Sequence, residues 1–231
     1  MTDRETFLSQ VRERRQRPFH YPVNDPGPDV PKSVLDEDLP ASDLIEHFTR
    51  MLRDVGGHVV RMSNPEAARE WLVRFVAEHG LERAVITRDV PVEGLATALT
   101  DAGMAVTMPP AGESVGHAAG QAFRHACIDA DLGVTGADFA VADTGTLVLL
   151  ARSGAPRMAS LLPPIHVALV GSDQLIPNLS VLIDRLRSDA WRDGLPSAMT
   201  LITGPSRTGD IEQTLSVGVH GPAEVWVVVI G

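Results

Sequence analysis

The sequence contains very little of what redox centres and disulfide-bonded domains are built from. Cys127 is the single cysteine among 231 residues, so no disulfide can form within the chain. One thiolate also cannot by itself hold an iron–sulfur cluster or a structural zinc ion. Because Cys127 follows an apolar stretch with helical character, we expect a buried core residue rather than a nucleophile. The eight histidines show no HxH, HxxxH or HExxH spacing, so the sequence predicts no metal site.

Aromatic residues, positive charge and phosphate-binding motifs are scarce as well. Aromatic residues make up 4% of the chain, and 20 Lys and Arg stand against 30 Asp and Glu, a formal net charge of −10. This balance argues against a nucleic-acid partner. The patterns GxGxxG and GxxxxGK[ST] are absent, which argues against a dinucleotide site of the usual kind and a P-loop. Since the N-terminus is charged and no apolar run is long enough to cross a membrane, we expect a soluble, cytoplasmic protein without a membrane partner.

The chain does contain enough aliphatic residues for one good α/β core. Hydrophobic residues make up 44% of the sequence, and the length suits a single domain. Residues 1–40 combine a helical pattern with a Pro-rich stretch, which predicts an N-terminal helix and a Pro-rich arm. That arm either wraps a neighbouring surface or is a mobile tail. Residues 41–231 alternate amphipathic helices with short apolar strands, which predicts one α/β domain with a parallel sheet covered by helices.

Two segments depart from this alternation. In "GVTGADFAVADTGTLVLL" the apolar runs follow one another too closely for intervening helices, so we expect an antiparallel insertion there. The final run, "AEVWVVVI", is almost continuously apolar, which is typical of a strand that is buried on both faces.

A loop near the C-terminus, "ITGPSRTGDIEQ", is the first candidate site. We expect it to join a parallel strand, "AMTLIT", to a helix that begins near Ser206, at the carboxyl edge where α/β sheets bind ligands. A helix N-terminus and the planar guanidinium of Arg207 suit a carboxylate or phosphate. The candidate ligand-binding residues of this loop are Gly204, Ser206, Arg207 and Thr208. Alternatively, the loop is only a capped helix start in which Arg207 pairs with Asp210 or Glu212.

A second Gly-centred loop, Asp143-Thr144-Gly145-Thr146, lies between two apolar runs. Gly145 permits a backbone geometry in which successive N–H groups face an anion, so Thr144, Gly145 and Thr146 are candidate ligand-binding residues. A plain hairpin turn explains the same residues equally well. A third loop, "VTGAD" at residues 134–138, has the same chemistry. His166 and His220 flank strands, where each is either a hydrogen-bonded structural residue or within reach of a site.

The sequence motifs assign no catalytic residue. Asp143 and Glu212 are the candidate carboxylates for a general base or a nucleophile.

Three stretches together resemble the lactate-utilisation protein C family (LutC/YkgG-like, LUD domain). They are "GVTGADFAVADTGTLVL", "RMASLLPPIHVALVGSDQLIPNL" and "ITGPSRTGDIEQTLSVGVHGPAEVWVVVI". The resemblance runs from about His117 to the C-terminus, and upstream it concerns layout more than motif. It implies a three-layer α/β/α fold with a mostly parallel sheet and an antiparallel insertion, of the type shared by ribose-phosphate isomerases, glucosamine-phosphate deaminases and CoA transferases (the NagB/RpiA/CoA-transferase-like fold).

The resemblance also implies a function. The family is associated with a three-protein system that oxidises L-lactate to pyruvate, in which the partners, lactate-utilisation proteins A and B, carry the iron–sulfur clusters and this chain carries no cofactor. We therefore expect a non-redox component of a lactate oxidase or dehydrogenase complex, with a pocket for a small carboxylate or phosphate. Two alternatives remain open. One is a free-standing sugar-phosphate isomerase or CoA-transferase-like enzyme that uses Asp143 or Glu212, and the other is a structural assembly subunit without a ligand.

Overall fold

The computed structural model describes Thr6, Ser9 and residues 40–112, 116–186, 196–209 and 215–231. The prediction of a helix and a Pro-rich arm over residues 1–40 therefore lies outside the described residues, apart from single positions. Within the described part of the chain, no helix combines the length and the apolar character that crossing a membrane requires.

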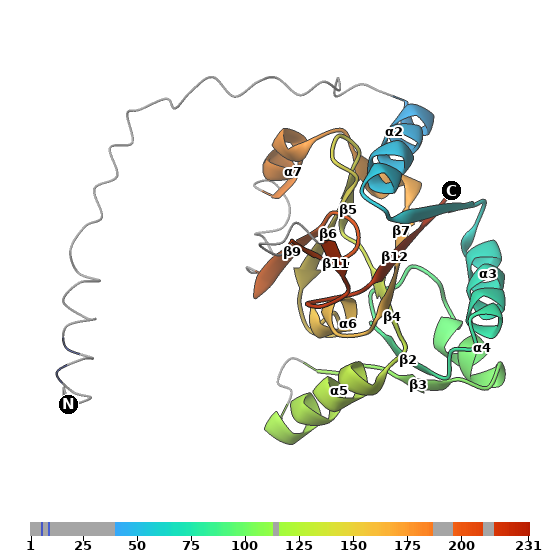
Figure 1. The fold of residues 1–231 in the computed structure, drawn as a ribbon, viewed down its shortest axis with the longest axis vertical. Helices are drawn as coiled ribbons and strands as arrows, with labels where there is room; N and C mark the ends of the chain where they lie inside the picture. Colours follow the sequence, from blue (N-terminus) through green and yellow to red (C-terminus); the bar gives the residue numbers. More distant parts are fainter. Residues whose placement is uncertain (1–5, 7–8, 10–39, 113–115, 187–195, 210–214) are drawn as a thin grey trace. The chain divides into compact units, whose positions relative to one another are not determined.

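A six-stranded parallel sheet forms the centre of the unit that contains residues 40–231 (Figure 1). In spatial order its strands are β1 (His58–Met62), β12 (Glu224–Ile230), β7 (Ile165–Gly171), β4 (Leu132–Gly136), β2 (Arg83–Ile86) and β3 (Ala105–Thr107). Every neighbouring pair in this sheet is parallel. The last apolar run lies between β1 and β7, and Val227 and Val228, which point to opposite faces, are both fully buried. The parallel sheet and the doubly buried last strand are confirmed.

Helices cover both faces of this sheet. The helices of this unit are α2 (Ala41–Asp54), α3 (Pro65–Glu78), α4 (Leu95–Asp101), α5 (His117–Asp129), α6 (Met158–Leu161) and α7 (Leu179–Arg185), with a 3₁₀ turn, η1 (Ser172–Gln174). Of these, α7 packs against the second sheet, which is described below, and not against the large one. One face packs against α3 and α4 through Leu72, Leu99 and their neighbours. The start of α3 follows its sequence signals, because the Asn64 side chain accepts a 2.8 Å hydrogen bond from the Ala67 N–H and Pro65 occupies the first turn.

A second, four-stranded sheet lies on the opposite face of the large sheet. Its spatial order is β8 (Leu175–Ile176), β5 (Phe139–Val141), β6 (Thr146–Ala151) and β9 (Ala198–Ile202). The pairs β5–β6 and β6–β9 are antiparallel, so the predicted antiparallel insertion is confirmed. Leu147 of the second sheet and Phe48 of α2 pack in one buried cluster with Val227 of the large sheet. The α/β fold class with its mostly parallel central sheet is therefore as the sequence predicted.

The segments α5 and α6 pack on that same face. Cys127 of α5 is fully buried in a small cluster with Val85 and Ala159. Burial raises the pKa of its thiol to about 11. The prediction of a core cysteine is confirmed.

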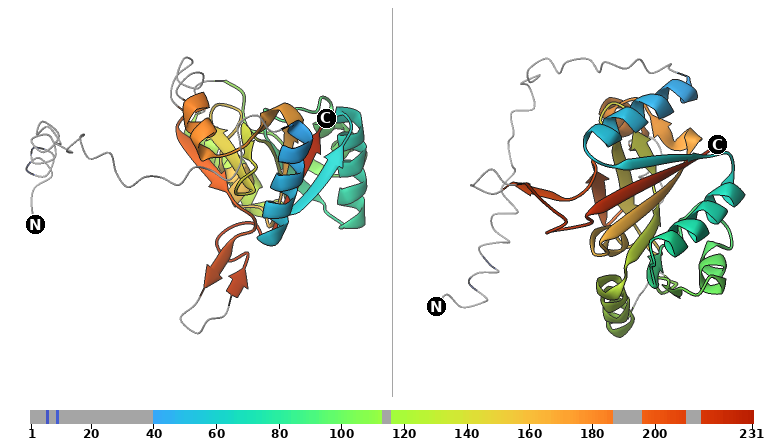
Figure 2. Two further views of the ribbon diagram at one scale, coloured as in Figure 1. Left: turned by 90° about the horizontal axis from the view of Figure 1, so that it is seen from above. Right: turned by 45° about the vertical axis from the view of Figure 1, so that its right-hand side comes forward.

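Two predictions about the C-terminal third were wrong. The run "AMTLIT" is not part of the parallel sheet, because β9 is antiparallel to β6 in the second sheet. No helix begins near Ser206. Instead, β10 (Arg207–Gly209) pairs in antiparallel fashion with β11 (Leu215–Val217), and this ribbon projects from the rest of the unit (Figure 2). The β-branched residues Thr208 and Val217 favour strand geometry, and Gly209 disfavours a helix interior.

Candidate functional site

The strand order of the parallel sheet identifies where a ligand site is expected. From β2 the chain moves outward to its neighbour β3, whereas from β4 it moves in the opposite direction to β7. The strands that follow β2 and β4 in this sheet therefore lie on opposite sides of the pair, which makes the carboxyl ends of β2 and β4 the switch point of the sheet. In open α/β sheets, ligands bind at such a switch point.

A small polar pocket lies at this switch point, and we call it the switch-point pocket. Its lining combines two buried hydroxyls, a carboxylate, an arginine and apolar side chains: Thr87, Asp89, Thr135, Leu149, Leu150, Ala151, Ala155, Pro156 and Arg157. The empty space is about 250 Å³ when the open mouth is included, but only about 10 Å³ accepts a water-sized sphere. The enclosed part therefore has room for about one water molecule or one ligand oxygen.

Close backbone approach shapes the pocket. A Cβ atom on Gly136, the last residue of β4, would collide with the backbone carbonyl of Asp89. The Arg88 N–H donates a 2.8 Å hydrogen bond to the Gly154 carbonyl, which ties the segment after β2 to the turn after β6. Because Gly136 has no side chain, the segments that follow β2 and β4 can lie against each other at the mouth.

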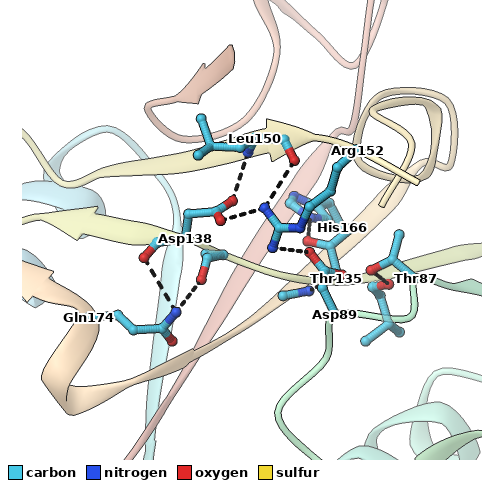
Figure 3. Close-up of polar contacts among 11 residues, drawn as sticks. Thr87, Asp89, Thr135, Asp138, Leu150, Arg152, His166 and Gln174 are labelled. Atoms are coloured by element: carbon cyan, nitrogen blue, oxygen red, sulfur yellow. Dashed lines mark hydrogen bonds and ion pairs between the residues drawn. The ribbon is translucent and has the colours of Figure 1, made fainter. Parts of the chain in front are cut away.

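An ion network borders the pocket (Figure 3). Asp138 accepts hydrogen bonds from the Leu150 N–H at 2.7 Å and from Arg152 Nη1 at 2.6 Å. Arg152 Nη2 also lies 3.7 Å from Asp89 Oδ2. The Asp89 and Asp138 side chains are 17% and 14% exposed, and Arg152 is 46% exposed. Arg152 is therefore held by two carboxylates, and its charge is already neutralised within the protein.

Gln174 fixes the backbone on which Asp138 sits. Its amide Nε2 donates to the carbonyls of Ala137 at 2.7 Å and Asp138 at 3.3 Å, and its Oε1 accepts the Gly171 N–H at 2.7 Å. The two carbonyls of this bend are thereby paired, so the position of Asp138 is determined from both its backbone and its side chain.

Behind the pocket, His166 contacts Thr135. The two atoms His166 Nε2 and Thr135 Oγ1 lie 2.9 Å apart. His166 on β7 stands opposite Gly133 on β4, and the space beside the Cα atom of Gly133 is filled by the Ala159 carbonyl. The ring is fully buried, and its Nδ1 atom has no hydrogen-bond partner among the described residues. Burial lowers the pKa of His166 to about 4, so the ring is neutral at neutral pH.

Arg157 differs from Arg152 in having its charge available. It lines the pocket and is exposed to solvent. Within the described part of the chain, its guanidinium has no ion pair and no hydrogen bond. A planar cation beside two threonine hydroxyls is a suitable arrangement for a carboxylate or a phosphate.

The two loops that the sequence singled out lie next to each other, but at the other end of β6. Thr144 Oγ1 donates to Thr146 Oγ1 at 2.7 Å, and Thr146 Oγ1 lies 2.7 Å from Thr203 Oγ1. Gly145 has a φ of 63° and packs against the backbone of Leu52 in α2. Thr146 begins β6 and the pocket lies at its end, so this threonine cluster is separate from the switch-point pocket.

The anion site near Ser206 was predicted from a helix N-terminus, and that helix start is replaced by the strand β10. Arg207 donates from Nη2 to the Val55 carbonyl, at the C-terminal end of α2, and Gly204 packs against Val55. The guanidinium therefore satisfies a free helix carbonyl and complements the negative end of the helix dipole. The Ser206 N–H donates to the Pro222 carbonyl at 2.9 Å, and Thr208 pairs with Ser216 in the β10–β11 ribbon.

Of the two candidate catalytic carboxylates, only Asp143 belongs to the described residues. Asp143 lies in the turn between β5 and β6, where its backbone N–H donates to the Pro177 carbonyl at 2.9 Å. Glu212 and Asp210 lie outside the described residues. That Gly204, Ser206, Arg207, Thr208 and the Asp143–Thr146 loop bind an anion stays a prediction.

The sequence identified only part of the switch-point pocket and of the polar residues around it. Thr135 and Asp138 belong to the "VTGAD" loop, and His166 was noted as a strand-flanking histidine. Thr87, Asp89, Arg152 and Arg157 were missed. The available signal was "TRD" directly after the strand "RAVI", since polar residues after a parallel strand lie at the ligand-binding edge. Among the described residues, His, Cys, Asp and Glu side chains nowhere gather in groups that could hold a metal ion.

Comparison with known proteins identifies the family. The model of the LUD domain matches residues 45–230. A lactate utilization protein C from Halalkalibacterium halodurans is 38% identical over 115 residues, 49% of this chain and 50% of that protein. One from Exiguobacterium is 41% identical over 112 residues, 48% of each chain. The chain thus spans about half the length of these curated relatives. One from Anoxybacillus flavithermus is 28% identical over 98% of both chains.

The fold also has a solved counterpart. The crystal structure of a DUF162 family protein from Deinococcus radiodurans matches with a TM-score of 0.57 and 22% identity, covering 84% of this chain and 99% of that one. These matches confirm the resemblance that the sequence motifs indicated. The chain belongs to the LUD domain family.

Proposed function

We propose that this chain acts in lactate use, as the non-redox component of a system that oxidises L-lactate to pyruvate. The observation that carries the proposal is the agreement of several relatives named lactate utilization protein C, one of which aligns over 98% of both chains. The partners would be the iron–sulfur lactate-utilisation proteins A and B. The state of the single cysteine supports this division of roles, because the thiol of Cys127 is fully buried and its pKa is raised.

The ligand in this proposal is a small carboxylate in the switch-point pocket. The pocket lies at the edge where α/β sheets bind ligands, and Arg157 supplies a positive charge that no other described residue neutralises. One carboxylate oxygen fits the enclosed space beside the hydroxyls of Thr87 and Thr135. The remaining atoms of a three-carbon acid would lie in the open mouth, next to Pro156 and Arg157. The threonine cluster at the other end of β6 offers no comparable charge, since Arg207 already binds the end of α2.

Growth on L-lactate as sole carbon source tests the proposal. A strain without this gene would carry the wild-type chain, Arg157→Ala or Arg74→Ala at matched protein levels. Arg74 serves as the control. It is an exposed arginine of α3, the helix that packs on the face of the large sheet opposite to the second sheet. We expect the wild type and Arg74→Ala to restore growth and Arg157→Ala to fail.

Three other results would each contradict a different part of the proposal. Normal growth of the deletion strain on L-lactate would exclude the lactate role and turn attention to sugar phosphates and acyl-CoA compounds. Full rescue by Arg157→Ala would retain the lactate role but reject the pocket as the ligand site. Turnover of L-lactate by the purified chain without any iron–sulfur protein would contradict the non-redox assignment.

A further inference from the structure

We infer that the Thr135 hydroxyl is the hydrogen-bond donor that recognises an oxyanion in the switch-point pocket, and that His166 positions it by donating from Nε2 to Thr135 Oγ1. The part that concerns the ligand rests on the proposed function. The part that concerns the histidine and the threonine rests on the geometry of the folded chain alone.

The tautomer of His166 decides which atom donates in its contact with Thr135. The ring is neutral, so one of its two nitrogens carries a hydrogen and the other has a lone pair. Nε2 lies 2.9 Å from Thr135 Oγ1, and the buried Nδ1 has no partner among the described residues. A hydrogen on Nδ1 would be a buried donor without an acceptor, which folded proteins avoid more strictly than an unpaired acceptor. The geometry therefore favours the form with the hydrogen on Nε2.

The tautomer of His166 also determines where the hydroxyl hydrogen of Thr135 points. If His166 Nε2 donates to Thr135 Oγ1, the hydroxyl hydrogen of Thr135 cannot be used on the ring. In the part of the chain that the structure describes, no other hydrogen bond is formed by this hydroxyl, and the side chain is only 2% exposed. Because Thr135 lines the pocket, the free hydrogen is available there as a donor.

A hydrogen-bond donor in the pocket indicates the class of ligand that it would bind. An ionised carboxylate or a phosphate oxygen only accepts hydrogen bonds, so a donor fixed in advance suits it. Thr135 and Arg157 would then bind the same oxyanion, one as an oriented donor and the other as the positive charge. His166 itself makes no contact with the ligand and acts as a positioning residue through Thr135.

The tautomer can be measured without any ligand. Long-range ¹H–¹⁵N correlation spectra of the full-length, ¹⁵N-labelled chain distinguish a protonated ring nitrogen from one with a lone pair. We expect His166 to be protonated at Nε2 in the wild type, and we expect this signal to shift in Thr135→Val. A ring protonated at Nδ1 would overturn the inference, because Thr135 would then donate its hydrogen to the ring.

Binding of L-lactate tests the donor. Isothermal titration would compare the wild type with Thr135→Ser, which keeps the hydroxyl, and Thr135→Val, which keeps the shape. Thr100→Val, on the exposed side of α4, is the control. We expect Thr135→Val to weaken binding by roughly tenfold to a hundredfold, the effect of one hydrogen bond to a charged group, whereas Thr135→Ser and Thr100→Val stay close to the wild type.

Two results would count against the inference in different ways. Equal affinity of Thr135→Val and Thr135→Ser would show that the hydroxyl is no recognition group, although the pocket would still be the site. If the wild-type chain binds no L-lactate, the proposed ligand is wrong and the recognition role falls with it. The spectra then still decide the contact between His166 and Thr135.

Discussion

The two ends of strand β6 carry similar residues but use them differently. At its start, the threonine cluster has its hydroxyls bonded to one another, and the nearby Arg207 binds the end of α2. At its end, the switch-point pocket keeps the guanidinium of Arg157 without a partner among the described residues, and the Thr135 hydroxyl contacts only His166 there, while Arg152 is neutralised by two carboxylates. Residue type alone does not distinguish the two ends, whereas the bonding of each polar group does.

This difference separates stabilisation from recognition. A polar group whose bonds are all made within the chain holds the fold together, but it has no bonding capacity left for a ligand. Groups of both kinds lie at or beside the switch-point pocket, since Asp138 and Gln174 are engaged within the chain, whereas the guanidinium of Arg157 has no partner among the described residues. The following predictions test whether the two ends of β6 differ as described.

The largest expected effect is steric and should appear at both ends. A Cβ atom on Gly133 would collide with the Ala159 carbonyl, and one on Gly145 would lie 2.5 Å from the Leu52 backbone nitrogen at a positive φ. We expect either alanine substitution to lower the free energy of unfolding by about 3 kcal/mol or more. Urea denaturation measures this, with Gly116→Ala, where the Cβ meets open space, as the control. A loss below about 1 kcal/mol at either site would contradict the close packing.

The second effect is confined to the pocket end and depends on pH. The pKa of His166 is about 4 in the folded chain against 6.5 as its ordinary value. Between these values the unfolded chain binds a proton that the folded chain does not, so stability falls as the pH is lowered. Lowering the pH from 7 to 5 should remove about 2 kcal/mol through this residue. His166→Gln should lose this dependence, as measured by urea denaturation at both pH values. An unchanged pH dependence in the variant would mean that the ring is already charged or accessible.

Asp138→Ala tests the frame of the pocket. The substitution removes the acceptor of the Leu150 N–H and one of the two carboxylates that hold Arg152. Because Arg152 is partly exposed and keeps Asp89, we expect a loss of roughly 1–2 kcal/mol rather than the larger cost of a fully buried pair. Thermal unfolding checks the value, with Asp101→Ala at the exposed end of α4 as the control. A neutral result would show that the network contributes no rigidity to the pocket.

Arg207→Ala is expected to have the smallest effect and to distinguish the two ends most clearly. The exposed guanidinium bonds one helix carbonyl, so its loss should cost about 0.5–1 kcal/mol. Growth on L-lactate should remain normal, in contrast to Arg157→Ala. The reverse result, with Arg207→Ala defective and Arg157→Ala normal, would make the threonine cluster the working site and would restore the prediction made from the sequence.

The elements that could be predicted from the sequence are those with local signals. Asn64 and Pro65 identify a helix start, and the valines of β12 identify a strand buried on both faces. The β10–β11 ribbon was missed because "PSRTGDIEQ" has the small hydroxyl and the acidic residues of a helix start, although Gly209 and the β-branched Thr208 favour a strand. Strand patterning also does not specify a partner, so β9 was assigned to the wrong sheet.

The pocket could not be assembled from the sequence for a topological reason. Asp89, Thr135 and His166 are separated by dozens of residues, and they meet because β2, β4 and β7 are neighbours in an order that differs from the chain order. The hydrophobic pattern indicates that strands exist but does not determine this order. The contact between His166 and Thr135 likewise forms only because β4 and β7 are adjacent.

The position of Cys127 gives this protein a reporter of its own motions. The thiol lies on the buried side of α5, in the same small cluster as Ala159 of α6, whose carbonyl packs against Gly133 of β4. A thiol reagent can modify Cys127 only when this layer separates from the sheet. The rate of labelling therefore measures how often this layer opens, and slower labelling in the presence of a ligand would show that binding and opening are linked.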